Sequence, residues 1–126
     1  MASTLGPGSA NPLVGDLRRS GLVTVLVLHY VAEEASYGNL LMDRICDLTG
    51  GAVAVNPNTM YPLLHSLEAR GLIAGEWEHP DRRSRRFYRI TERGEEERRR
   101  LATELEPNLD AIAAMIDLIR HELNSH

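Results

Sequence analysis

The chain of 126 residues has one cysteine, no lysine and few aromatic side chains. Its single cysteine, Cys46, cannot form an intrachain disulfide, which favours a reducing compartment. With so few Phe, Trp and Tyr residues, the core must be filled mainly by Leu, Val, Ile and Ala. No apolar run approaches the roughly 20 residues that a membrane span needs, and the N-terminus lacks the pattern of a signal peptide. We therefore expect one cytoplasmic domain, with an appended oligomerisation segment.

The sequence also lacks the residue patterns of a metal centre, a phosphate loop or a catalytic site. The histidines are scattered, with neither His-x-x-x-His nor Cys-x-x-Cys spacing. Gly50-Gly51 is not followed by the Lys-Ser/Thr of a phosphate-binding loop. Cys46 is interpreted as a small buried hydrophobe, with a redox sensor as the alternative. The sequence thus predicts a protein that is not an enzyme and needs no cofactor.

The formal net charge of −4 conceals a strongly cationic segment. Residues 82–93 carry six arginines and a single acid, Glu92, whereas residues 1–69 and 101–126 are both net negative. A polyanion responds to the local field of a patch rather than to the total charge. Every cationic side chain is an arginine, so each can contact phosphate in a bidentate manner. The acidic total therefore does not exclude nucleic acid as a partner.

The first part of the chain predicts a flexible arm followed by two helices. Residues 1–17 are rich in Gly, Pro, Ser and Ala, which is typical of a flexible N-terminal arm. The apolar run over residues 21–35 favours a buried helix over a strand, because no breaker interrupts it. Ser36 is expected to cap a second helix from Tyr37 to about Thr49, which ends at Gly50-Gly51.

A third helix is predicted between Asn56 and Gly71. Asn56-Pro57 is a typical N-cap and first helical position, and the apolar side chains at helical spacing are Met60, Leu63, Leu64 and Leu67. They leave small polar or aromatic groups on the open side: Asn58, Thr59, Tyr61, Pro62, His65 and Ser66. Asparagine can pair with adenine, and the threonine methyl can contact thymine. The helix therefore fits a DNA major groove; alternatively, Asn56 and Thr59 only cap it and Tyr61 only packs against the next element.

An arginine-rich β-hairpin is predicted next. Two strand-like runs, LIAGEWEH and SRRFYRI, flank a loop of about four residues at Pro80–Arg83. The cationic side chains near its tip are Arg82, Arg83, Arg85 and Arg86. Because no acids are interleaved with them, local ion pairing does not explain this run, whereas contact with phosphates or a minor groove does. Trp77, Phe87 and Tyr88 are interpreted as braces between the hairpin and the helices.

A long last helix is predicted over residues 92–126, capped by Thr91. Its first turns offer Glu95–Arg99 and Glu96–Arg100 as surface ion pairs. Further along, apolar residues recur at spacings of four and three: Leu105, Leu109, Ile112, Ile116, Ile119 and Leu123. Such a seam binds another helix, so we expect it to form a homodimer interface. Pro107 is expected to kink or break the helix.

The element order predicts a mainly α fold with a small β-hairpin: a winged helix-turn-helix over residues 18–91 and a C-terminal dimerisation helix over residues 92–126. Residues 21 to about 97 closely resemble the PadR family of bacterial transcriptional regulators. The motifs that carry this resemblance are YG at 37–38, NTMYPLL at 58–64, LE at 67–68, GLI at 71–73, EW at 76–77, RFYRIT at 86–91 and Gly94.

The resemblance implies a homodimeric repressor that binds a two-fold symmetric operator, often in its own promoter. It also implies that the third helix enters the major groove, that the hairpin reaches the minor groove or backbone, and that the residue at Tyr61 faces phosphates. Some members bind small effectors near the dimer interface, but the last helix here has no aromatic residue to stack on one. The candidate DNA-binding residues are Tyr37, Asn56, Asn58, Thr59, Tyr61, Pro62, His65, Arg82, Arg83, Arg85 and Arg86.

A second hypothesis belongs to a different class of protein. A winged-helix module can bind another protein, and the same arginines would then contact an acidic partner. A gel-shift experiment against the chain's own upstream DNA separates the two hypotheses, because only a DNA-binding protein retards that fragment at low salt.

Overall fold

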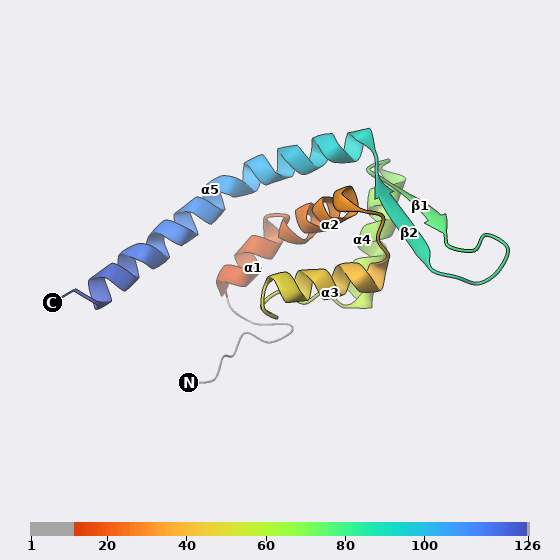
Figure 1. Ribbon diagram of the computed structural model, residues 1–126. Helices are drawn as coiled ribbons and strands as arrows, with labels where there is room; N and C mark the ends of the chain where they lie inside the picture. The colour runs from red at the N-terminus through yellow and green to blue at the C-terminus, as the bar shows by residue number, and fades with distance from the viewer. Residues whose placement is uncertain (1–11, 126) are drawn as a thin grey trace.

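The first described element is a helix where the sequence predicted a flexible arm. The structure is a computed structural model that describes residues 12–125, so residues 1–11 of the predicted arm lie outside the described residues. Residues 12–17 belong to α1 (Pro12–Arg19), which lies beside α2 (Figure 1). The flexible-arm prediction was wrong here because Pro12 occupies the start of a helix, and because Val14 packs against the core.

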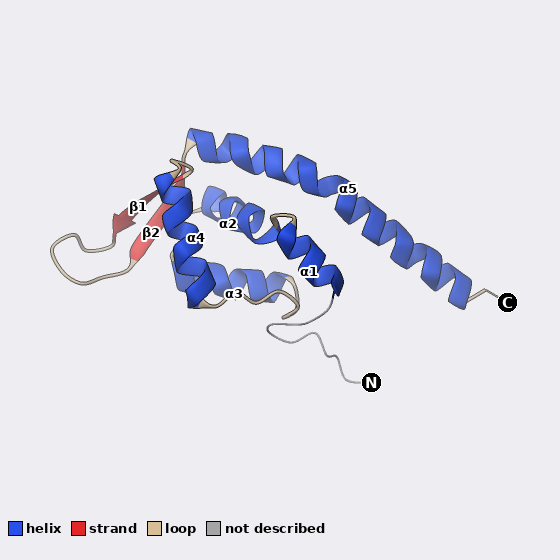
Figure 2. Ribbon diagram, turned by 180° about the vertical axis from the view of Figure 1, so that it is seen from behind, coloured by secondary structure: helices blue, strands red, loops and turns tan. Residues whose placement is uncertain are grey.

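The predicted buried helix is confirmed as α2 (Leu22–Glu33). Val27 and Leu28 are fully buried, and apolar residues occupy every face of this helix. Figures 1 and 2 show the reason, since α2 lies between α1, α3, the hairpin and α5. A helix that is apolar on every side is stable only in such a central position.

The second predicted helix is α3 (Gly38–Leu48), but Ser36 does not cap it. Ser36 is fully buried and pairs with Tyr88, since its amide donates to the Tyr88 carbonyl at 3.1 Å and its own carbonyl accepts from the Tyr88 amide at 2.8 Å. Its hydroxyl donates to the Glu34 carbonyl instead of accepting from an amide of the helix. The prediction failed because a long-range backbone pairing outcompeted the local cap.

The third predicted helix is confirmed as α4 (Pro57–Ala69). The Asn56 carboxamide oxygen accepts a hydrogen bond from the Thr59 amide at 3.1 Å, as the N-cap pattern indicates. Met60, Leu64 and Leu67 are fully buried and anchor the helix on α3 and the first strand of the hairpin. The opposite side of α4 is consequently free for other contacts.

The hairpin consists of β1 (Ile73–Trp77) and β2 (Arg86–Ile90), paired antiparallel from Ile73 with Ile90 to Trp77 with Arg86. Residues 78–85 connect the strands, so the predicted four-residue loop was too short. One more backbone bond joins the Glu78 amide to the Arg85 carbonyl. Beyond it, the Ser84 hydroxyl accepts from the His79 amide at 2.9 Å, and the Arg82 amide donates to the His79 carbonyl at 3.4 Å in a turn at the tip.

The last helix is α5 (Glu92–Leu123), with Thr91 as its N-cap. Pro107 does not break it. Thr103, whose carbonyl lacks an amide partner at Pro107, is exposed, so water can satisfy that carbonyl. The first half of α5 packs on α2, and the second half projects from the domain (Figures 1 and 2). In the part of the chain that the structure describes, we find no helix of the length and apolarity that a bilayer crossing requires.

Candidate nucleic-acid interface

One side of α4 is open along its whole length. Its exposed side chains include every residue that the sequence placed there: Asn58, Thr59, Tyr61, Pro62, His65 and Ser66. Asn56, at the cap, is exposed as well. The helical spacing of the apolar residues thus predicted which side of α4 is buried and which side is exposed. The face is polar, narrow and unobstructed, as a helix that enters a groove must be.

Tyr61 is held in place by α3. A Cβ added to Gly38 would lie 2.7 Å from the Tyr61 ring, so only glycine leaves space for it there. The Tyr61 hydroxyl donates to the Asn39 carboxamide oxygen at 3.4 Å, and the side chain remains partly exposed. Tyr61 therefore has a fixed position at the start of α3.

A groove of about 320 Å³ separates this helix from the hairpin. Tyr61 and His65 line it from α4, and Trp77 and Arg85 line it from the hairpin side. Trp77 also borders a second hollow next to Arg82 and Arg83. The open side of α4 and the arginines of the loop are therefore connected along one continuous surface.

The four arginines near the tip of the hairpin are not equivalent. Arg82 and Arg83 are exposed and make no ion pair with any residue in the described range 12–125. Arg85 and Arg86 do have acidic partners, which lie outside the local spacing that the sequence analysis considered. Their partners, Glu78 and Glu68, are 7 and 18 positions away, and local spacing does not reveal such pairs.

Arg85 forms a bidentate pair with Glu78. Its guanidinium also lies 4.4 Å from the centre of the Tyr37 ring, which packs edge-on against Phe87. The bound guanidinium holds the pKa of Glu78 below its usual value. Tyr37, which the sequence nominated as a DNA contact, is thus partly covered by Arg85.

Arg86 turns back towards α4. Its Nη2 lies 2.6 Å from the Glu68 carboxylate, and its guanidinium carbon lies 5.1 Å from the centre of the Trp77 ring. This pairing holds the pKa of Glu68 below its usual value. Tyr88 is buried, as expected of a brace between the hairpin and the helices. Trp77 is about half exposed, so it fills this role only in part.

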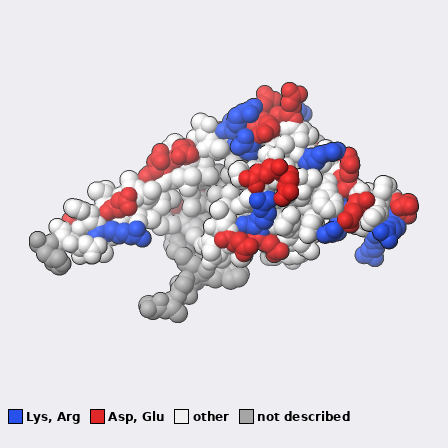
Figure 3. Space-filling view, viewed as in Figure 1, with Lys and Arg blue, Asp and Glu red and all other residues white. Residues whose placement is uncertain are grey.

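Charged side chains of both signs cover the visible face, but the two ends of the molecule differ in their balance. Figure 3 shows basic side chains at the projecting end of the hairpin, while the outer part of α5 carries mainly acidic ones. Repulsion from a polyanion is therefore greatest at the far end of α5 and smallest at the hairpin.

The apolar seam of α5 is exposed except at its first position. Leu105 is buried against α2 within the same chain, so it already has a partner. Beyond it the seam residues are wholly or partly accessible, namely Leu109, Ile112, Ile116, Ile119 and Leu123. A helix that leaves such a row open beyond its own domain lacks its packing partner.

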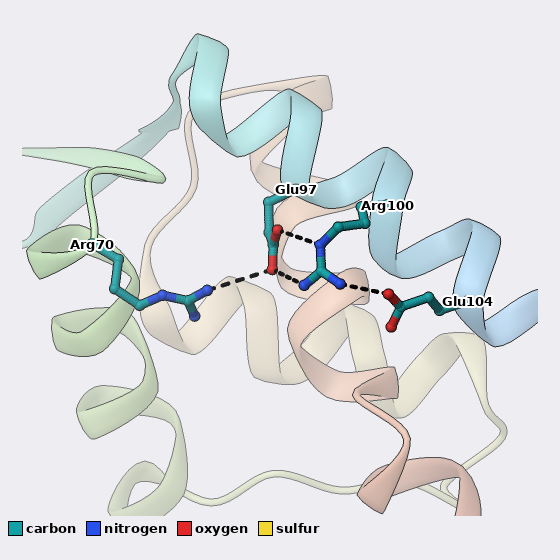
Figure 4. Close-up of polar contacts among 4 residues, drawn as sticks. All are labelled: Arg70, Glu97, Arg100 and Glu104. Carbon is teal, nitrogen blue, oxygen red and sulfur yellow. Dashed lines mark hydrogen bonds and ion pairs between the residues drawn. The ribbon is translucent and has the colours of Figure 1, made fainter.

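The start of α5 is joined to the end of α4 by charged side chains. Glu97 accepts from Arg100 at 2.7 Å and from Arg70 at 3.4 Å, and Arg100 reaches on to Glu104 (Figure 4). These contacts replace the Glu96–Arg100 pair expected from the sequence, and Arg98 takes the place of Arg99 as the partner of Glu95. Glu95 and Glu97 thus pair at three-residue spacing, whereas Glu104 pairs with Arg100 at four-residue spacing.

The three helices α2, α3 and α4, the two-stranded hairpin and the projecting helix α5 define this protein as a winged helix-turn-helix protein, with α1 added before them. Residues 27–100 match the profile of the transcriptional regulator PadR-like family. Because this match covers more than half of the sequence, the chain belongs to the PadR-like family of transcriptional regulators. The resemblance read from the motifs is thereby confirmed, and so is the fold class.

Known proteins with similar sequences or structures agree with this assignment. A transcriptional regulator of Mycobacterium tuberculosis is 39% identical over 72 residues, which are 57% of this chain and 64% of that protein. The chain thus spans slightly under two thirds of that relative. The crystal structure of a PadR family transcriptional regulator from Eggerthella lenta has a TM-score of 0.66 and 32% identity, covering 82% of this chain and 88% of that one. A transcriptional regulator from Clostridium thermocellum has a TM-score of 0.68 and 25% identity, covering 79% and 96%.

Proposed function

We propose that the protein is a cytoplasmic, homodimeric repressor that binds a two-fold symmetric DNA operator. In this proposal, the exposed side of α4 enters the major groove and the loop of the hairpin contacts the neighbouring backbone or minor groove. The observation that carries the proposal is the placement of Arg82 and Arg83. Both are exposed and make no ion pair with the described residues, and they border the surface that leads to α4.

The two parts of this surface have different tasks in the proposal. Asn58, Thr59 and His65 present short polar groups to base edges, which carry the sequence information. Arg82 and Arg83 contact phosphates, which set affinity but not sequence preference. Tyr61, held by Gly38, lies at the boundary between the two parts and is proposed to face the backbone.

Dimerisation supplies the second half-site in this proposal. The seam from Leu109 to Leu123 is accessible on a helix that extends beyond its own domain. Pairing of this helix with a second copy would bury the seam and place two copies of α4 about one helical turn of DNA apart. Leu105 is left out of the proposed contact, because its own chain covers it.

An effector would bind between α2 and α5. A cavity of about 280 Å³ lies there, lined mainly by apolar side chains. His29, Arg98 and Glu106 supply its polar groups. Since α5 is the proposed dimer helix, occupation of this cavity is expected to change the separation of the two copies of α4 and to release the operator.

The test uses fluorescence anisotropy at several salt concentrations to measure binding of the protein to a labelled fragment of its own upstream DNA. The wild type is expected to bind this fragment more tightly than a scrambled duplex. In the double variant Arg82→Ala/Arg83→Ala, the slope of log K against log salt should decrease by about 2 on both duplexes, because each lost phosphate contact contributes about 0.9. Asn58→Ala should weaken binding only to the operator, by about 1–3 kcal/mol.

The matched control is Arg99→Ala/Arg120→Ala. These arginines are also exposed and make no ion pair within the described residues, but they lie on α5. The control changes the net charge equally and should keep the salt slope. An unchanged slope in the Arg82/Arg83 variant contradicts the proposed role of the loop. If the protein does not bind the upstream DNA at low salt and captures an acidic protein, the protein-interaction hypothesis is supported instead.

A further inference from the structure

One carboxylate joins α4 to both strands of the hairpin. Glu68, in the last turn of α4, accepts from Arg86 Nη2 at 2.6 Å and from Arg86 Nε at 3.4 Å. The same carboxylate accepts from the backbone amide of Gly75 in β1 at 3.3 Å. Glu68 therefore contacts β1 and β2 at once, from a helix whose open side faces the proposed major groove.

The surroundings of Arg86 are shaped for this contact. Its guanidinium lies between the Trp77 ring, at 5.1 Å, and the Tyr88 ring, at 5.9 Å. Gly75 leaves the space that the Arg86 side chain occupies, because a Cβ at this position would lie 2.6 Å from Arg86 Nε. The side chains of Arg86 and Glu68 are only 27% and 30% exposed. A bidentate pair with so little access to water is screened less than a surface pair and is geometrically more specific.

The other ion pairs of the hairpin have a different geometry. Glu76 with Arg89, and Glu78 with Arg85, each join the two sides of the hairpin to one another and are more exposed. Within residues 12–125, Glu68 with Arg86 is the ion pair that links the hairpin to α4. Among the described residues, the orientation of the hairpin relative to α4 thus depends on the polar contacts of this one carboxylate, with Arg86 and with the Gly75 amide, in addition to the apolar packing.

We propose that Glu68 is a positioning residue that sets the angle between α4 and the hairpin, and that Arg86 serves Glu68 rather than a DNA phosphate. This inference rests on the proposed function and removes Arg86 from the candidate DNA-binding residues that the sequence predicted. An arginine already engaged by a carboxylate brings no net charge to the DNA surface and would have to break two hydrogen bonds to contact phosphate. With a fixed angle, the major-groove helix and the loop contact one duplex at the same time. No conformational entropy is then lost in orienting the hairpin on binding.

The first part of the test needs no DNA. Three variants are compared: Glu68→Ala, which removes the carboxylate; Gly75→Ala, whose Cβ displaces Arg86 without changing any charge; and Glu76→Ala, the control on the opposite face of the hairpin. Gly75 does not have a positive φ, so alanine fits its backbone. Circular dichroism confirms that each variant is folded.

Two signals report on the contact directly. Trp77 is the only tryptophan of the chain, so its fluorescence emission senses whether Arg86 remains beside it. Hydrogen exchange of the Gly75 amide, measured by NMR, senses its bond to Glu68. We expect Glu68→Ala and Gly75→Ala to change Trp77 emission, and Glu68→Ala to accelerate Gly75 exchange by about tenfold, the scale of one charge-assisted hydrogen bond. Glu76→Ala should change neither signal.

The second part measures binding to the upstream DNA over a range of salt. Glu68→Ala, Gly75→Ala and Arg86→Ala should each weaken operator binding by about tenfold or more while the salt slope stays that of the wild type. Arg83→Ala should instead reduce the slope by about 0.9, because it removes a phosphate contact. The double variant Glu68→Ala/Arg86→Ala should be no worse than either single variant, since both act through one contact.

The outcomes separate this inference from the proposed function. Unchanged Trp77 emission and Gly75 exchange in both Glu68→Ala and Gly75→Ala would overturn the contact itself, whatever the DNA result. A slope reduced as much in Arg86→Ala as in Arg83→Ala would show that Arg86 contacts phosphate and would overturn the positioning role. If the two signals change as expected but the wild type binds no DNA, the proposed function fails while the link between α4 and the hairpin stands.

Discussion

At the scale of single residues, neighbouring side chains of one type have different environments. Arg83 is exposed and makes no ion pair with the described residues, whereas Arg86 is half-buried against α4. They are three positions apart and identical in chemistry. The difference arises from what each can reach: the loop carries Arg83 away from the domain, and β2 places Arg86 over Glu68. A count of arginines therefore overestimates the charge that is available to a polyanion.

At Gly94 the tertiary structure leaves no space for a Cβ atom. A Cβ at this buried position would lie 2.0 Å from the backbone oxygen of Leu72 and 2.7 Å from a side-chain carbon of Ile90. Neither α5 nor the strand can move independently, because Thr91 bonds to the Gly71 carbonyl. We predict that Gly94→Ala lowers the free energy of unfolding by about 3 kcal/mol.

The measurement for Gly94 is urea denaturation followed by circular dichroism at fixed protein concentration. The control is Gly15→Ala in α1, where the nearest atom to a new Cβ is the mobile end of Arg19 at 3.4 Å. This substitution should be neutral or stabilise by up to about 1 kcal/mol, because alanine favours a helix. Equal stability of Gly94→Ala and the wild type would contradict the close packing at the hairpin–α5 junction.

At the scale of elements, paired carboxylates fix the C-terminal end of α4. Glu68 joins α4 to the hairpin, and Glu97 joins it to α5 through Arg70 and Arg100 (Figure 4). Both carboxyls have a pKa below the usual value, Glu68 because of Arg86 and Glu97 because of Arg100. α4 is thus connected to both the hairpin and α5 by interactions that require ionised glutamates.

These shifts predict a direction for the effect of pH on stability. A carboxyl whose pKa is lower in the folded state stabilises that state above its unfolded pKa, about 4.3 for glutamate, and this contribution is lost as the pH falls through the lower folded value. The free-energy difference between the wild type and Glu68→Ala/Glu97→Ala should therefore be largest near pH 7 and smaller at about pH 3. Urea unfolding at the two pH values measures it.

The control for the pH experiment is Asp43→Ala, which removes an exposed acid of α3 that makes no ion pair with the described residues. Its effect on stability should be similar at the two pH values. A difference for the Glu68/Glu97 variant that does not shrink at low pH would mean that the paired carboxylates do not stabilise the fold.

At the scale of the whole molecule, the dominant feature is a helix that extends beyond the domain it belongs to. α5 contains 32 residues, and its second half makes no use of the core (Figure 1). Ile116 and Ile119 are 37% and 49% exposed there. A row of such side chains is costly to leave in water, and a second copy of the same helix offers the complementary surface.

We predict that Ile112→Asp/Ile116→Asp converts the protein from a dimer to a monomer of about 14.1 kDa. Two carboxylates in each seam would have to be buried without partners, which helix pairing cannot compensate. Light scattering after gel filtration measures the mass. The control Ala111→Asp/Ala114→Asp adds the same charges to faces of α5 that the helical period places away from the seam. A folded seam variant that keeps the wild-type mass would disprove this interface.

The helices and their caps were predictable because the interactions that define them are local. Asn56 and Thr91 cap α4 and α5 as their sequence context indicates, and the apolar period of α4 separated its buried from its open side. Ser36 was not predictable in this way, since its partner, Tyr88, is far along the chain. The length of the hairpin loop was also missed, because hydrogen bonds between the Ser84 side chain and the His79 backbone take part in closing it.

The candidate site was predictable in composition but not in the roles of its members. Glu68 could have been listed among the acidic residues near the end of α4. No local spacing in the sequence, however, pairs it with Arg86. Its contact with Arg86 exists only because α4 and the hairpin meet at that point. Trp77 was likewise identifiable as a strand residue, whereas its exposure depends on where the hairpin projects.

The amino-acid sequence by itself determined which segments are helical, which face of α4 is apolar, and that a surplus of arginine lies on a hairpin. Each of these follows from interactions within a few residues: capping, helical periodicity and local charge. Only the tertiary structure decided which arginines remain free, which carboxylate holds the hairpin, and which part of the α5 seam is already covered. Those properties depend on distances between segments far apart in the chain, and packing sets these distances.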